Sequence, residues 1–81
     1  MTMRVLATVE CRCEAVGDEN PVAVHFGEDR IAVAELVSDA VVGSVVAGER
    51  TERRALVRLE NGELLELQRH LPDGEWRVFR P

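Results

Sequence analysis

The dipeptide Asn61-Gly62 constrains the fold more than any other feature, because it separates two alternating segments, residues 53–60 and 63–70. Asn-Gly is the preferred pair for a type I′ hairpin loop, in which both loop residues take positive φ. A two-residue loop also sets the pairing of the two strands that it joins. Three leucines are then expected on one face of the sheet: Leu56, Leu65 and Leu67.

The same pairing gathers arginines on the hairpin. With a two-residue loop, Arg54 lies opposite Arg69, and Arg53 and Arg58 are close by. Like charges directly across a strand pair are unfavourable unless something anionic compensates them. Two interpretations stay open: neighbouring glutamates neutralise the arginines, or the four arginines form a site for phosphate or for a partner's carboxylates.

Alternation with a period of two continues outside the hairpin, as expected for strands with one buried face. Residues 4–16 predict one long strand, residues 22–26 a second, and residues 76–80 a last short strand. We expect Trp76 to close one end of the core, with its indole N–H bonded to a backbone carbonyl. Turn-forming residues occur at three places between the strands: 17–21, 27–29 and 71–75.

Residues 31–42 fit two kinds of secondary structure. Their apolar residues match helical spacing as well as strand alternation, so periodicity alone does not decide between them. The valine content and the short connection at Gly27 favour a strand over residues 30–38, with room for one short helical turn after Ser38.

The chain has 81 residues, which suits one domain over residues 1–81. Five to six short antiparallel strands with tight turns predict a mainly β fold, either a small curved antiparallel sheet or a partly open barrel. A deep substrate cavity would consume core that a chain of this size needs, so its length argues against a self-contained enzyme. No catalytic residue and no cofactor is assigned.

Charge is unevenly distributed along the chain, whose formal net charge is −5. Residues 1–49 carry three arginines against nine acidic residues, whereas residues 50–81 carry seven arginines against six. An acidic half and an Arg-rich half favour self-association or a basic partner over general nucleic-acid binding. No apolar stretch is long enough for a membrane span, and the first ten residues lack the apolar block of a signal peptide, so we expect a cytoplasmic protein.

Residues 41–48 are apolar and punctuated by glycine. No charged residue within them would deter edge-to-edge strand pairing. If this segment lies on the surface, it is the best candidate for the contact of a homodimer.

Cys11 and Cys13 fall on the same side of the first predicted strand. Their Cα atoms, about 6.6–7 Å apart at strand rise, are at the upper limit for a disulfide. We expect both to be small apolar core residues, and a metal or redox role is the alternative. His25 and His70 are the only other obvious ligands and lack zinc-finger spacing, so no metal site is assigned and both are expected on the surface.

Residues 26–37, 53–67 and 76–78 together resemble a family of short bacterial β-rich domains of unknown function, over about residues 21–80. The shared pattern is a basic pair, an apolar-Arg-apolar strand, a glycine hairpin, a Glu-Leu strand and a terminal Trp strand. This chain lacks the aromatic residues that the family carries after its Ile-x-Val strand and after its basic pair. The resemblance implies a compact β domain without an assigned activity.

These features predict a non-enzymatic protein-interaction or accessory module, stabilised by homodimerisation. Its expected contact surfaces are the apolar segment 41–47 and the Arg-rich hairpin, with Arg53, Arg54, Arg58 and Arg69. One alternative is a small metal or redox sensor that uses Cys11 and Cys13. The other is a nucleic-acid-binding accessory domain that uses the arginines of the second half: Arg53, Arg54, Arg58, Arg69, Arg77 and Arg80.

Overall fold

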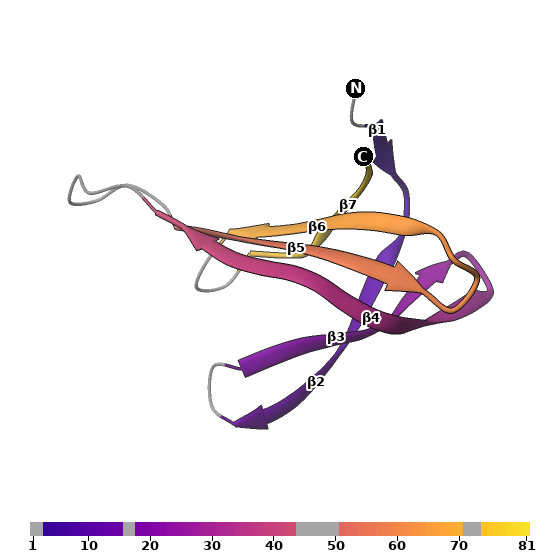
Figure 1. Ribbon diagram of the computed structural model, residues 1–81, viewed down its shortest axis with the longest axis horizontal. Helices are drawn as coiled ribbons and strands as arrows, with labels where there is room; N and C mark the ends of the chain where they lie inside the picture. Colours follow the sequence, from indigo (N-terminus) through magenta and orange to yellow (C-terminus); the bar gives the residue numbers. More distant parts are fainter. Residues whose placement is uncertain (1–2, 16–17, 44–50, 71–73) are drawn as a thin grey trace.

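The computed structural model describes residues 3–15, 18–43, 51–70 and 74–81, without the side chains of residues 13–15, 18 and 19. One antiparallel sheet contains all the strands in this part of the chain, in the order β1-β7-β6-β5-β4-β3-β2 (Figure 1). The strands are β1 (Met3–Val5), β2 (Thr8–Ala15), β3 (Asp18–Phe26), β4 (Asp29–Val42), β5 (Glu52–Leu59), β6 (Leu64–His70) and β7 (Arg77–Arg80).

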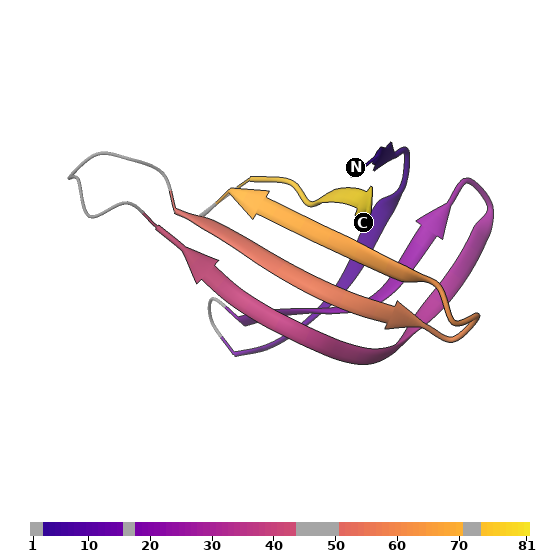
Figure 2. The same cartoon turned by 45° about the horizontal axis from the view of Figure 1, so that its top comes forward.

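The sheet curls into a half-barrel, which confirms the predicted mainly β fold (Figure 2). It has seven strands rather than five to six because the long strand expected over residues 4–16 is divided in two. β1 pairs with β7 at one edge of the sheet, and β2 pairs with β3 at the other edge. The break at residues 6 and 7 lets the N-terminal segment reach both edges, so the sheet bends round on itself.

The core lies on the concave face of the half-barrel. Val57, Leu65, Leu67 and Val78 have no exposed surface, and residues from β1, β2 and β4 pack against this cluster. Burying an aliphatic side chain of this size contributes about 1.5–3 kcal/mol. The concave face is called the core face below, and the opposite face is called the outer face.

The hairpin between β5 and β6 turns at Gly62, but its loop has three residues, from Glu60 to Gly62. The N–H of Gly62 donates to the carbonyl of Leu59, and the N–H of Leu59 donates to the carbonyl of Glu63, each at 2.9 Å. Gly62 has a φ of 88°, whereas Asn61 does not take positive φ. This is a type I turn followed by a glycine bulge, not the predicted type I′ loop.

The longer loop shifts the pairing of β5 and β6 by one residue from the predicted pairing. Val57 lies opposite Leu65, and Leu56 lies opposite Glu66. Leu65 and Leu67 therefore share the core face as expected, but the prediction that Leu56 joins them is wrong. A one-residue shift exchanges the two faces of a strand relative to its partner.

The turn expected at residues 17–21 is wrong over most of its length, because β3 already begins at Asp18. Pro21 lies opposite Cys11 and Asn20 lies opposite Arg12. Proline is tolerated in a strand where its missing N–H is not needed for the ladder. β4 pairs only with Ala23 to Phe26 of β3, so the first part of β3 has no described partner on the β4 side.

β4 is a strand along all 14 residues, so the helical turn expected after Ser38 is wrong. Its first four residues, 29–32, pair with β3 on one side of the strand. Its pairing with β5 starts at Val33 and continues to Val42, with register shifts near Ala34 and Val37. In Figure 1 the two strands diverge after the β3–β4 turn, and β4 continues with β5 toward the grey trace.

We call residues 29–32 the two-sided segment of β4 and residues 33–42 its one-sided segment. The one-sided segment pairs with β5 along one edge. No described strand pairs with its other edge, because the pairing with β3 ends at Ala32. The two-sided segment is held between β3 and the β5–β6 loop, because the N–H of Glu60 donates to the carbonyl of Ala32 at 2.9 Å. The two parts of one strand therefore have different surroundings.

Candidate functional site

The four arginines predicted to form one cluster are divided between the two faces of the sheet. Arg53, not Arg54, lies opposite Arg69, and Arg54 lies opposite Gln68. Arg53 points to the same face as the buried Ala55, two residues further along β5. Arg54 and Arg58 point to the outer face, so the predicted pairing of Arg54 with Arg69 is wrong.

Arg53 is bound to a carboxylate of β4. Its Nε and Nη2 donate to the two carboxylate oxygens of Asp39 at 3.0 and 2.7 Å. This bidentate hydrogen bond lowers the pKa of Asp39 below its usual 3.8. The guanidinium also lies over the ring of Trp76, 5.4 Å from its centroid, at a distance typical of a cation–π contact.

The remaining arginines of the predicted site also have partners within the chain. Arg69 donates from Nε to the carbonyl of Gly74 at 2.7 Å. Arg54 lies 3.4 Å from Glu52, and Arg58 lies 3.6 Å from Glu35, in exposed ion pairs. Each arginine of the predicted site therefore already has an acceptor within the chain.

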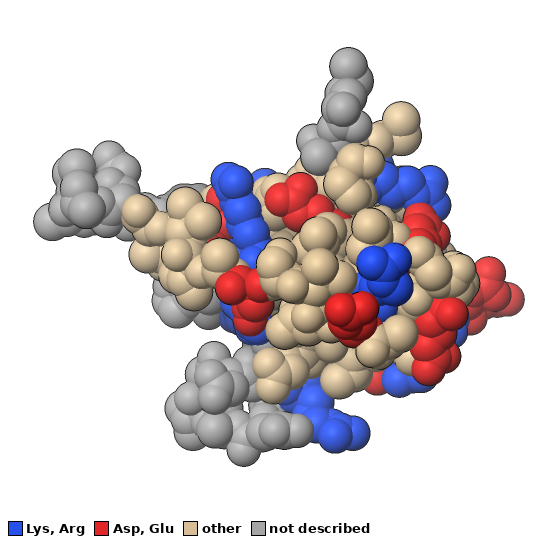
Figure 3. Space-filling view, viewed as in Figure 1, with Lys and Arg blue, Asp and Glu red and all other residues tan. Residues whose placement is uncertain are grey.

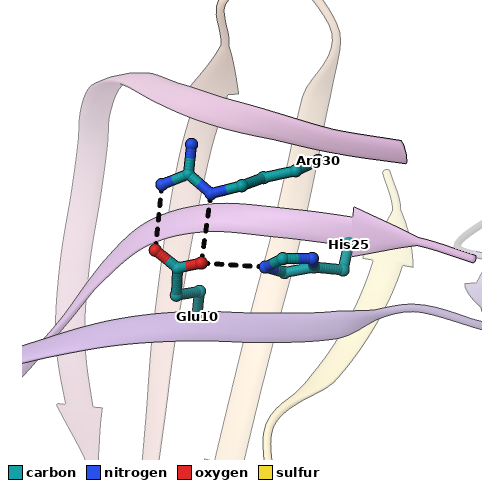
Figure 4. Close-up of polar contacts among 3 residues, drawn as sticks. All are labelled: Glu10, His25 and Arg30. Atoms are coloured by element: carbon teal, nitrogen blue, oxygen red, sulfur yellow. Dashed lines mark hydrogen bonds and ion pairs between the residues drawn. The ribbon is translucent and has the colours of Figure 1, made fainter. Parts of the chain in front are cut away.

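A second polar constellation, shown in Figure 4, joins β2, β3 and the two-sided segment of β4. Glu10 accepts hydrogen bonds from Arg30 at 3.1 and 2.9 Å and pairs with His25 Nε2 at 2.9 Å. The hydrogen bonds from Arg30 and then His25 lower the pKa of Glu10 from 4.5 to about 2. A carboxylate with so low a pKa is a weak proton acceptor near neutral pH, so this group clamps three strands rather than acting as a general base.

A third polar group, on the outer face, was not predicted from the sequence. Arg77 donates to Glu52 at 3.0 Å and lies 3.2 Å from His70 Nε2. Only the register of β5, β6 and β7 brings these residues together, so no local motif could have indicated them. Among the residues that the structure describes, three buried side-chain nitrogens have no hydrogen-bond partner: His70 Nδ1, Trp76 Nε1 and Arg77 Nε.

Trp76 packs against the core cluster as expected. Its indole N–H has no partner, so the predicted bond to a backbone carbonyl is wrong.

Cys11 is half-buried, and the side chain of Cys13 lies outside the described residues. Among the side chains that the structure does describe, no three His, Cys, Asp or Glu residues lie close enough to hold a metal ion.

The one-sided segment of β4 is the most unusual surface in the described part of the chain. Seven of its ten residues are apolar, yet each residue from Ala34 onward is exposed. Leu36, Val37, Val41 and Val42 keep between 41% and 64% of their surface in contact with solvent. A continuous exposed apolar strand with an unpaired edge is a typical site for adding another strand.

Figure 3 shows a group of uncharged residues over the C-terminal end of β4, with charged side chains closer to its N-terminal end. On the outer face beside it lies an open hollow of about 330 Å³, lined partly by Ser38, Ala40, Leu56 and Pro81. Residues 44–47 of the predicted dimer contact lie outside the described residues. Its described residues, Val41 to Gly43, are exposed, as a contact surface requires.

Comparison of the chain with family models, curated proteins and solved structures gave no match. The resemblance to short bacterial β-rich domains therefore stays a prediction. Within the described ranges, no helix is long and apolar enough to cross a membrane.

Proposed function

We propose that this protein is a protein-interaction module rather than an enzyme, and that its contact surface is the one-sided segment of β4. One observation carries the proposal: ten consecutive strand residues with β5 on one side and no described strand on the other. About half of these residues direct their N–H and C=O groups toward the open edge. An extended segment of another polypeptide can bind there as an additional strand.

The chemistry of this edge favours binding over protection. Natural edge strands are usually shielded by charged residues, especially lysine, or by proline. The stretch from Leu36 to Val42 contains one charged residue, Asp39, and its carboxylate is bound by Arg53. The register shifts near Ala34 and Val37 disturb the start of the segment, but pairing with β5 is regular from Ser38 to Val42.

The Arg-rich hairpin contributes to this surface indirectly. Arg53 neutralises the only carboxylate on the regular part of the edge and is itself held against Trp76. An aspartate without that partner would disfavour an apolar strand beside it, because burying an unpaired charge costs several kcal/mol.

The test compares two lysine variants of the tagged protein in native lysate. Val41→Lys places a charge on the proposed edge, whereas Leu6→Lys places one at the link between β1 and β2, where Leu6 is 90% exposed. On size-exclusion chromatography of the lysate, we expect wild type and Leu6→Lys to elute in assemblies larger than the single chain. Val41→Lys should elute at the size of the single chain. Equal elution of the two variants would show that another surface makes the contact.

A further inference from the structure

We infer that the occupant of this edge is a second copy of the chain, with the two one-sided segments paired antiparallel about a two-fold axis. This inference rests on the proposed function and names its partner. A two-fold axis places the same surface of both molecules in contact, so the surface must complement itself. A strand edge meets this condition, because a strand turned about an axis perpendicular to its sheet lies antiparallel to the original.

The distribution of side chains over the two faces restricts the register of such a pair. Residues directly opposite each other in an antiparallel pair point to the same face. Asp39 and Val41 point to the core face, because they lie opposite Ala55 and Arg53 on β5, whereas Ala40 points to the outer face. An axis at Asp39 would bring two carboxylates face to face, which is unfavourable.

An axis at Ala40 avoids this repulsion and uses the whole regular part of the strand. Ala40 then lies opposite Ala40 of the second copy, Asp39 opposite Val41, and Ser38 opposite Val42. Five consecutive residues of each copy pair without a register shift, since the pairing with β5 is regular over the same stretch. The exposed Val41 and Val42 lose solvent contact on both copies.

The charges near the segment also permit self-association. The carboxylates on or beside it, Glu35, Asp39 and Glu52, each lie within 4 Å of an arginine of the same chain. The formal charge of −5 on the whole chain is therefore not concentrated on this edge. Two copies can approach here without bringing unpaired like charges together.

The first measurement is the mass of the purified chain by sedimentation equilibrium, over about a hundredfold range of concentration. We expect a concentration-dependent species of twice the 9.0 kDa chain mass for wild type and for Leu6→Lys. Val41→Lys should stay at the single-chain mass, with circular dichroism used to confirm that it is folded. A wild-type protein that stays monomeric, or a dimer that Val41→Lys leaves intact, would overturn the inference.

The second measurement tests the register by oxidative cross-linking. In an antiparallel pair, opposite Cα atoms lie about 4.5–5.5 Å apart, which is within the range of a disulfide. Ala40→Cys should therefore link to itself between copies, whereas Ser38→Cys, on the same face, should not. Peptide mass mapping separates this product from any formed by Cys11 or Cys13. Cross-linking of Ser38→Cys instead of Ala40→Cys would exclude the axis at Ala40.

These outcomes separate the inference from the proposed function. A purified monomer that still loses its larger assembly in lysate through Val41→Lys would point to a different protein on the same edge. The proposed function would then stand and the second copy would be excluded.

Discussion

The two segments of β4 show how neighbouring parts of one strand can have opposite roles. Each segment contributes to a bidentate pair of an arginine and a carboxylate: Arg30 with Glu10, and Asp39 with Arg53. The two-sided segment pairs with β3 on one edge, accepts a hydrogen bond from the β5–β6 loop at Ala32 on the other, and places Ile31 against the core. The one-sided segment is richer in apolar residues but stays exposed, so burial here follows from pairing on both edges rather than from composition.

The largest expected difference between the two regions concerns leucine. Leu59 lies opposite Val33, at the boundary between the two segments, and is 1% exposed, whereas Leu36 is 47% exposed. Leu59→Ala should lower the free energy of unfolding by about 2–5 kcal/mol, because it leaves a cavity in the core. Leu36→Ala, the same chemical change, should lower it by less than about 1 kcal/mol.

Urea unfolding of the two variants measures this difference. Similar losses would mean that the one-sided segment is covered in the free chain, and the contrast between the two parts of β4 would disappear.

The next effect concerns the loop that holds the two-sided segment from the β5 side. Gly62→Val should destabilise the protein by about 1 kcal/mol or more, because a β-branched residue resists positive φ. Glu60→Val, in the same loop, is the matched control and should cost about 0.5 kcal/mol or less, since Glu60 does not take positive φ. Thermal unfolding distinguishes them, and equal melting temperatures would contradict the observed loop.

The sequence predicted the fold class because alternation, valine content and turn residues all pointed to antiparallel strands. It missed the register of the β5–β6 hairpin because Asn61-Gly62 occurs both in a two-residue type I′ loop and in a three-residue loop with a glycine bulge. That one residue moved Arg69 from the face of Arg54 and Arg58 to the face of Arg53. The choice between the loops depends on which leucines reach the core, and core packing is not a local property.

Other misses have a similar cause. The turn residues at 18–21 belong to β3, because their pairing with β2 overrides their local preference. The strand over residues 4–16 breaks at residues 6 and 7, where a closing sheet requires contact with both edges. The partners of Glu10 lie 15 and 20 residues away, so no spacing rule could have found them.

A smaller effect is expected from the ion pair in the one-sided segment. A double-mutant cycle of Asp39→Asn and Arg53→Gln should give a coupling of about 0.5–1 kcal/mol, because the pair is only partly shielded from solvent. The folded pKa of Asp39 lies below 3.8, so this contribution is present above pH 3.8 and is lost as the pH falls through the folded value. A coupling near zero in urea titrations at neutral pH would show that Arg53 does not stabilise the carboxylate.

The smallest effect at neutral pH is expected for Glu10, which is only half-buried, but its pH dependence separates it from Asp39. The pKa of Glu10 falls from 4.5 to about 2 on folding, so its stabilising contribution is complete above pH 4.5 and is lost as the pH falls toward 2. Glu10→Gln should therefore unfold with a shallower acid dependence than wild type in this interval, because it removes the carboxylate that Arg30 and His25 bind. Parallel acid titrations of Glu10→Gln and wild type would mean that the contacts of Glu10 with Arg30 and His25 do not hold β2, β3 and the two-sided segment together. Core packing and strand pairing alone would then distinguish the two-sided segment from the one-sided segment.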